Sequence, residues 1–147
     1  MSWRGEAGGI EAANAGHDVV MAPNTYTYLD YDQAKAQDPG FREPFKIGPY
    51  CGLEVVYGYD PIPAGITADQ KKHVLGSQGQ LWTEFMPDPG QVEFMAWPRL
   101  AALSEVLWSP KEGKDYKDFQ NRLPQDLKRL DAQDVNYRPA GGPRWPY

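Results

Sequence analysis

The sequence contains one cysteine and no long apolar run, and each scarcity excludes a class of protein. Cys51 is the only cysteine among 147 residues, so an internal disulfide framework is excluded. One cysteine is compatible with both the cytoplasm and the periplasm, so the compartment stays open. No stretch approaches the ~20 consecutive apolar residues of a membrane span, and we expect a soluble protein without a membrane partner.

Positive charge and metal-binding side chains are also scarce. Lys and Arg number 15 against 20 Asp and Glu, which gives a formal net charge of -5 at pH 7. A nucleic-acid partner is therefore not expected, because phosphate backbones bind to basic surfaces. His17 and His73 have no neighbours at a spacing typical of a metal site, and no phosphate-binding or serine-hydrolase motif occurs. We expect neither a metal nor a cofactor.

The first part of the sequence shows an α/β rhythm. Residues 8–17 are rich in alanine and predict a short helix that stops at Gly16. Residues 18–23 are nearly all apolar and end in proline, which favours a parallel strand covered on both faces. The polar, tyrosine-rich residues 24–32 then predict a loop at the carboxyl end of this strand. Ligands gather at such strand ends in α/β proteins.

The middle of the chain predicts a long loop, a short helix and a second strand. Residues 38–66 hold many Pro, Gly and aromatic residues, which is typical of an ordered functional loop. Thr67 is expected to cap a short helix that runs through Lys72. Residues 74–82 predict a strand whose glycines permit close approach of the backbone.

Two helices and a tail are predicted after this strand. Apolar residues recur at helical spacing over residues 91–108, which predicts one long amphipathic helix kinked at Pro98. A further helix is predicted over residues 116–130, with Pro124 limiting its regularity. Residues 138–147 are rich in Pro and Gly and predict an extended tail.

Aromatic and acidic side chains gather at the ends of the two predicted strands. The first cluster comprises Trp3, Tyr26, Tyr28 and Asp30, and the second comprises Trp82 and Glu84. A sugar ring has an apolar face that stacks on indole and hydroxyls that donate to carboxylates, so these clusters suit a carbohydrate. Tryptophan is also an ordinary core residue, and a structural role is equally compatible with the pattern alone.

Glu105 is a third carboxylate of interest because it lies among apolar residues of the predicted long helix. We interpret it as a structural group rather than a catalytic one. The expected partner is Arg99 or Arg4.

Six short segments, in this order, resemble the last part of the family 20 glycoside hydrolases, the β-N-acetylhexosaminidases. They are Ser2-Trp3-Arg4-Gly5, Gly16 to Pro23, Tyr28-Leu29-Asp30, Val74-Leu75-Gly76, Leu81 to Glu84, and Trp97 to Glu105. The set is specific, whereas any one segment alone is not. The resemblance implies an α/β fold, namely the C-terminal portion, about strands 6 to 8, of a (β/α)8 TIM barrel. Residues 1–137 would form this partial barrel.

The resemblance also implies roles for five residues at the carboxyl ends of the strands. Trp3 and Trp82 are similar to the walls of the pocket for a terminal N-acetylhexosamine. Tyr28 is similar to the hydroxyl group that holds the acetamido carbonyl oxygen. Asp30 and Glu84 resemble the carboxylates that bind sugar hydroxyls, chiefly those at C4 and C6.

The implied activity is hydrolysis of terminal N-acetylglucosamine or N-acetylgalactosamine by a substrate-assisted retaining mechanism. The general acid of the family belongs to an Asp-Glu pair on the fourth strand, and no Asp-Glu dipeptide occurs in this sequence. One hypothesis is a fragment that is active when an N-terminal barrel part or another copy completes it. The other is an inactive sugar-binding or structural fragment. Because a partial barrel has unpaired strand edges, we expect a homo-oligomer, most simply a dimer.

Overall fold

Two short apolar segments form a parallel sheet near one end of the molecule. The computed structural model describes residues 1–35 and 47–139. Strand β1 (Val19–Met21) pairs in parallel with β2 (Val74–Ser77). On the other side of β1, Ser2 forms a further parallel bridge with Met21. Three segments therefore run side by side in one direction, and their carboxyl ends share one edge.

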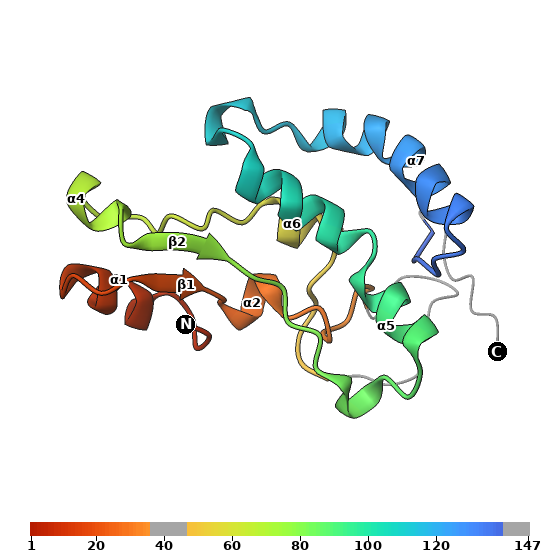
Figure 1. Cartoon of the computed structure of the whole chain (residues 1–147), viewed down its shortest axis with the longest axis horizontal. Helices are drawn as coiled ribbons and strands as arrows, with labels where there is room; N and C mark the ends of the chain where they lie inside the picture. Colours follow the sequence, from red (N-terminus) through yellow and green to blue (C-terminus); the bar gives the residue numbers. More distant parts are fainter. Residues whose placement is uncertain (36–46, 140–147) are drawn as a thin grey trace.

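Helices lie beside this sheet and extend away from it. In Figure 1, α1 lies beside β1, α6 lies beyond the tip of β2, and α7 lies on the outer side of α6. The elements, in chain order, are α1 (Ala7–Asn14), β1, α2 (Asn24–Thr27), α3 (Leu53–Tyr57), α4 (Ala68–Lys71), β2, the 3-10 turn η1 (Thr83–Phe85), α5 (Pro89–Ala96), α6 (Arg99–Trp108), the 3-10 turn η2 (Lys111–Gly113) and α7 (Tyr116–Ala132). Among the described residues, no helix is both long enough and apolar enough to cross a membrane.

The ends of two helices follow the local sequence as predicted. Gly16 adopts a φ of 77°, and the amide of His17 donates to the carbonyl of Ala12 at 2.9 Å. This arrangement closes the helix C-terminus and ends α1 at Asn14, a little before the predicted limit. Thr67 caps α4 as predicted, because its side chain accepts a hydrogen bond from the third amide of that helix.

The second strand is shorter than the predicted range 74–82. Pairing with β1 ends at Ser77, directly after Gly76, which has a φ of 136° and so departs from the geometry of a regular strand. The close backbone approach predicted for the glycines is present at Gly79. A Cβ atom there would lie 3.0 Å from Cδ1 of Leu29.

Two segments predicted as loops contain helical turns. Helix α2 occupies the start of the predicted loop at 24–32, and α3 lies within the predicted loop at 38–66. Residues 38–46 of the second loop lie outside the described residues. Helix α3 buries Val56 and Tyr57 completely or nearly so, and it packs against α6. Packing therefore determines this helix more than local propensity does.

The predicted long helix at 91–108 is two helices. Helix α5 begins after Asp88, whose carboxylate accepts from the amide of Gln91 at 2.9 Å. It ends before the cis Trp97–Pro98 peptide bond, and α6 begins at Arg99. Trp97, the residue before Pro98, has extended backbone with φ -102° and ψ 139°, the region that a following proline favours, and this ends α5. The break is therefore complete, where the sequence predicted a kink.

Helix α7 confirms the predicted helix at 116–130. It buries Phe119 and Leu123, and it continues through Pro124 without interruption, contrary to the expected irregularity. The predicted tail begins with Arg138, whose amide donates to the carbonyl of Trp97 at 3.1 Å. Residues 140–147 of that tail lie outside the described residues.

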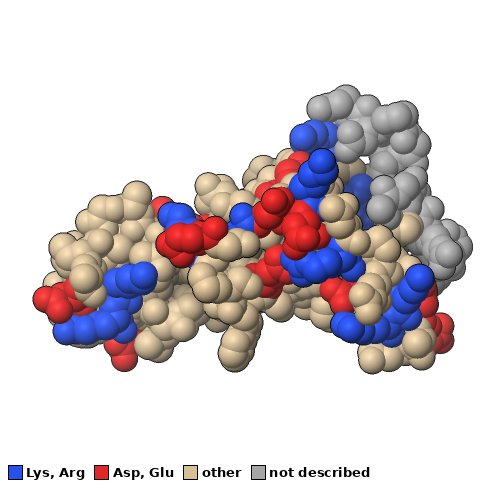
Figure 2. Space-filling model, turned by 90° about the horizontal axis from the view of Figure 1, so that it is seen from above, with Lys and Arg blue, Asp and Glu red and all other residues tan. Residues whose placement is uncertain are grey.

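The apolar core lies between the sheet, α3 and α6, and continues beneath α7. Its buried members are Ala13, Val19, Met21, Leu29, Cys51, Val56, Tyr57, Tyr59, Ala102, Leu103, Val106, Phe119 and Leu123. On the face seen in Figure 2, acidic and basic side chains are interspersed over the described surface. Several charged side chains of the described residues form ion pairs, such as Arg129 with Asp126 at 2.8 Å.

Candidate functional site

Tyr28 and Trp82 meet at the carboxyl edge of the parallel segments. A parallel bridge joins Tyr28 to Gln80, because the amide of Gln80 donates to the carbonyl of Thr27 and the amide of Leu29 donates to the carbonyl of Gln80, both at 2.8 Å. The rings of Tyr28 and Trp82 lie 6.4 Å apart between centroids, with their planes tilted by 49°. The Trp82 side chain is 49% exposed, so part of the indole surface faces solvent.

The main chain of Trp3 also lies at this edge. Its carbonyl accepts from the amide of Asn24 at 3.0 Å, which attaches it to the loop that follows β1. The indole is 41% exposed, and the guanidinium of Arg4 lies 4.6 Å from the ring centroid. Among residues 1–35 and 47–139, no ring contact joins Trp3 to Tyr28 or Trp82.

Asp30 is a buried carboxylate. It is 5% exposed, and its Oδ1 atom has no hydrogen-bond partner within the described part of the chain. Burial raises the pKa of Asp30 from its ordinary value of 3.8 to about 6. A main-chain hydrogen bond and the positive charge of Arg99 lower this pKa, and the negative charge of Glu84 raises it. An acceptor held in this way is suited to a neutral hydroxyl donor.

Glu84 was predicted to lie directly at a strand end. It lies instead in the exposed turn η1, because β2 stops at Ser77. It acts on Asp30 through its charge. Two carboxylates of different exposure, which interact through charge, therefore lie in the segments that carry Tyr28 and Trp82. This combination of aromatic surface and acceptor oxygens can hold a polyhydroxylated ring.

Tyr31 belongs to the same loop and was missed in the sequence. Its ring lies 5.4 Å from that of Tyr28, and its hydroxyl accepts from Nδ2 of Asn24 at 3.4 Å. Burial raises the pKa of Tyr31, and the negative charge of Asp30 adds to this effect. The position of Tyr31 next to Asp30 was the only sequence signal for it.

Arg99 was also missed as a site residue, and its side chain is fully buried. Nη2 donates to the carbonyls of Leu29 and Met95 at 2.5 and 2.6 Å. Nη1 donates to the carbonyls of Tyr31 and Cys51 at 3.0 and 2.8 Å. The guanidinium therefore connects the Asp30 loop, the segment before α3 and the end of α5.

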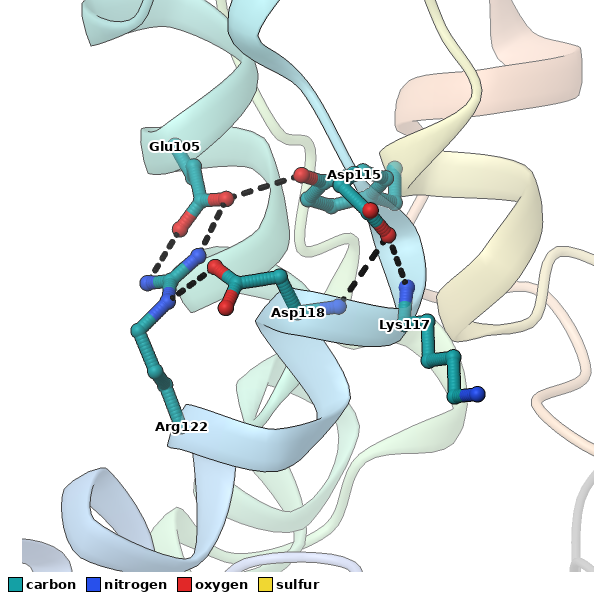
Figure 3. A network of polar contacts seen from close by, with 6 residues as sticks. Glu105, Asp115, Lys117, Asp118 and Arg122 are labelled. Carbon is teal, nitrogen blue, oxygen red and sulfur yellow. Dashed lines mark hydrogen bonds and ion pairs between the residues drawn. The ribbon is translucent and has the colours of Figure 1, made fainter.

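Glu105 is a structural carboxylate, but the expected partners Arg99 and Arg4 are wrong. Figure 3 shows it facing Arg122 of α7. Both terminal nitrogens of Arg122 donate to the Glu105 carboxylate at 2.8 Å, and Tyr57 donates to it at the same distance. These hydrogen bonds lower the pKa of Glu105, that from Arg122 most. The group joins α6, α7 and α3.

Arg122 also donates to Asp118 at 2.7 Å, while Asp115 caps α7 through the amides of Lys117 and Asp118. Figure 3 shows these contacts as one network at the start of α7. The network lies among residues that hold helices together. It therefore has a structural role and does not belong to the sugar edge.

The side chain of Gln80 is buried. It is 6% exposed, and its amide group lies 3.1 Å from the hydroxyl of Thr27. Val20 of β1 is half-buried, and Leu75 of β2 is 65% exposed.

The histidines lie away from this edge. His17 is exposed, and Nδ1 of His73 lies 2.9 Å from Oδ1 of Asp18. Within the described ranges, no group of three or more His, Cys, Asp or Glu side chains is placed to hold a metal ion.

A cleft of about 1210 Å³ lies elsewhere, between residues 58–66, β2 and the end of α6. Its apolar lining includes Ile62, Leu75 and Trp108, of which Trp108 is 90% exposed. None of the five candidate sugar-binding residues lines it. The candidate site is therefore the strand edge, and the cleft is a separate surface with a mixed polar and apolar lining.

Known proteins resemble this chain in sequence and in structure. Residues 1–111 match the model of glycosyl hydrolase family 20, catalytic domain. A β-hexosaminidase of Porphyromonas gingivalis is 46% identical over 93% of this chain, which covers 17% of that protein. A β-N-acetylhexosaminidase of Cellulomonas fimi is 28% identical over 93% of this chain, which covers 27% of that protein.

Solved structures give the same result. A family 20 exo-β-N-acetylglucosaminidase of Vibrio harveyi, in complex with N-acetylglucosamine, superposes with a TM-score of 0.79. It is 36% identical over 94% of this chain, which covers 21% of that structure. A family 20 β-N-acetylhexosaminidase of Streptomyces coelicolor gives a TM-score of 0.76 at 29% identity, over 97% of this chain and 27% of that structure. The chain thus spans less than a third of each of these relatives.

Proposed function

Because the chain belongs to glycosyl hydrolase family 20, we propose that it supplies the sugar-binding wall of a β-N-acetylhexosaminidase. Its substrates would be glycosides that end in N-acetylglucosamine or N-acetylgalactosamine. The observation that carries the proposal is the ring contact of Tyr28, two residues before the buried Asp30, with Trp82 at one strand edge. The Vibrio harveyi relative, which binds N-acetylglucosamine in its structure, supports the substrate class.

In the proposed mechanism the 2-acetamido oxygen of the substrate attacks its own anomeric carbon, with retention of configuration. Tyr28 donates its hydroxyl hydrogen to this acetamido oxygen and holds it near the attack position. The tilted indole of Trp82 lies beside Tyr28 and bounds the pocket. Restricting the acetamido group in this way lowers the entropic part of the barrier, and the hydrogen bond responds to the changing charge on the oxygen.

Asp30 and Glu84 are proposed to accept hydrogen bonds from sugar hydroxyls, chiefly those at C4 and C6. Asp30 has an acceptor oxygen without a partner in the described structure, and such a buried group gains most from a donor. Glu84 is exposed and can turn toward the same ring. Trp3 is proposed as a second wall.

The general acid is not supplied by this sequence, because no Asp-Glu dipeptide occurs in it. We propose that the chain corresponds to about strands 6 to 8 of a (β/α)8 barrel. It would then need an N-terminal barrel part, or a second copy, to complete the site. The absent dipeptide also favours a second candidate function, an inactive sugar-binding or structural fragment.

We expect partner chains at the edge of β2 with which no described segment pairs, and at the cleft. Leu75 of β2 and Trp108 of α6 are 65% and 90% exposed. Covering them would bury apolar area, and pairing would satisfy the edge of β2. Light scattering on the purified chain is expected to give a homo-oligomer, most simply a dimer. A monodisperse monomer at micromolar concentration would contradict assembly between copies.

Release of p-nitrophenol from its β-N-acetylglucosaminide tests the proposed activity. Turnover that is lost in Tyr28→Phe would support an active assembly, because that variant removes only the proposed acetamido donor. Turnover that persists in Tyr28→Phe would contradict the role of Tyr28. If the pure chain shows no turnover, calorimetric titration with N-acetylglucosamine separates a sugar-binding fragment from a purely structural one.

A further inference from the structure

Arg99 is buried at a point where three separate segments converge. Its guanidinium contacts the main chain of the Asp30 loop, the carbonyl of Cys51 and the carbonyl of Met95 at the end of α5. Desolvating a cation is costly, and five N–H donors in a fixed plane offset this cost only when they meet acceptors. The bonded carbonyls therefore occupy defined positions around the guanidinium.

Two of these carbonyls, of Leu29 and Tyr31, belong to the residues on either side of Asp30. Hydrogen bonds on both sides of a residue fix its main chain and so limit where its side chain can point. Asp30 itself is 5% exposed, and one of its carboxylate oxygens has no partner among the described residues. Arg99 therefore determines the position of this carboxylate without occupying its free acceptor atom.

Arg99 also acts on Asp30 through charge. Its positive charge lowers the pKa of Asp30, against burial and against the negative charge of Glu84, which both raise it. The thiol of Cys51 lies in the same environment, where burial raises its pKa and Arg99 lowers it. Arg99 is thus the cation that favours the ionised form of Asp30 in an otherwise unfavourable setting.

We propose that Arg99 is a positioning residue of the sugar-binding edge, which holds the main chain around Asp30 and keeps its carboxylate ready to accept a sugar hydroxyl. This role rests on the proposed function, because it assumes that Asp30 binds the sugar. Arg99 does not touch the sugar in this account. It acts only through the loop that it fixes and the charge that it supplies.

Two substitutions separate the two effects. Arg99→Gln removes the charge and most donors, whereas Arg99→Lys keeps the charge but has fewer, differently arranged donors. Titration of the Asp30 carboxyl by nuclear magnetic resonance, without sugar, is expected to show a higher pKa in Arg99→Gln than in the wild type. In Arg99→Lys the pKa is expected to stay close to the wild-type value. An unchanged pKa of Asp30 in folded Arg99→Gln would overturn the electrostatic part of the proposal.

The affinity for sugar measures whether Arg99 holds the Asp30 loop in position. We expect the dissociation constant for N-acetylglucosamine to rise on the order of tenfold in Arg99→Lys, because lost main-chain hydrogen bonds release the loop. Backbone amide shifts of residues 29–31 should change in the same variant. The matched control is Arg122→Gln, which breaks the bonds to Glu105 and leaves the loop untouched. If Arg99→Lys leaves both loop shifts and binding as in the wild type, the positional role is wrong.

These measurements also distinguish failure of the Arg99 role from failure of the proposed sugar site. If the wild-type chain binds no N-acetylglucosamine, the proposed sugar site fails, but the Asp30 titration and the loop shifts still test Arg99. If Arg99→Gln does not fold, the Arg99→Lys loop shifts, read against Arg122→Gln, still decide the positional role.

Discussion

Asp30→Asn is expected to stabilise the folded chain while weakening sugar binding. The carboxylate of Asp30 is buried, and burial raises its pKa from 3.8 to about 6. Between these two values the folded state binds more protons than the unfolded state, so stability falls as the pH rises through this window. The full cost of the charged group is present above about pH 6. Asparagine has nearly the same shape and carries no charge at any of these pH values.

The magnitude follows from the pKa difference. A rise from 3.8 to about 6 corresponds to about 3 kcal/mol at ~1.4 kcal/mol for each tenfold change. Burial is the main cause of this rise, and the amide of asparagine is itself a buried polar group with a desolvation cost, so only part of these ~3 kcal/mol is gained. We therefore expect Asp30→Asn to raise the free energy of unfolding at pH 7 by about 1 to 2 kcal/mol, with the gain disappearing near pH 4.

Urea denaturation of both proteins at pH 4, 5.5 and 7 measures this gain. Calorimetric titration with N-acetylglucosamine at pH 7 is expected to show a loss of affinity of about tenfold, because the amide is a weaker acceptor than the carboxylate. Asp69→Asn is the matched control, since the side chain of Asp69 is 96% exposed. A variant Asp30→Asn that is less stable at pH 7, or whose difference from the wild type does not depend on pH, would refute the reasoning.

Three further outcomes are expected. Trp82→Ala should weaken N-acetylglucosamine binding by about 1 to 3 kcal/mol and Trp97→Ala should not, because Trp82 contacts Tyr28 at the strand edge; calorimetry showing equal losses would remove Trp82 from the site. Glu105→Gln should lower the melting temperature at neutral pH. The lowered pKa of Glu105 contributes stability above pH 4.5 that is lost on acidification, so melting curves should converge at low pH. Thr67→Ala should cost about 1 kcal/mol in urea denaturation, and no change would show that the α4 cap does not contribute to global stability.

Features encoded by neighbouring residues were the ones that the sequence predicted well. The end of α1 depends on Gly16, which can adopt a positive φ, and the start of α4 depends on the pairing of Thr67 with Gln70. Helix α7 follows from apolar spacing alone. Each of these features is determined by residues of one helix and its cap, so no knowledge of the rest of the fold is required.

Features that depend on distant residues could not be predicted. Arg99 bonds to carbonyls 48, 68 and 70 positions away, and nothing near it in the sequence indicates these partners. Glu105 was expected to pair with Arg99 or Arg4, but α7 brings Arg122 to it from 17 positions away. The five candidate sugar residues came from motifs, and their roles stay predictions.

The contact between α6 and α7 joins the segment that the family model covers to the segment that follows it. The match to the family model ends at residue 111, before α7 begins. Yet Phe119 and Leu123 of α7 are buried in the common core, and Arg122 provides the cation for the half-buried Glu105. A polypeptide cut where the match ends would expose that apolar surface and leave Glu105 without its cation. The family model therefore covers less than the segment that has to fold together, whereas the Porphyromonas gingivalis relative matches 93% of this chain.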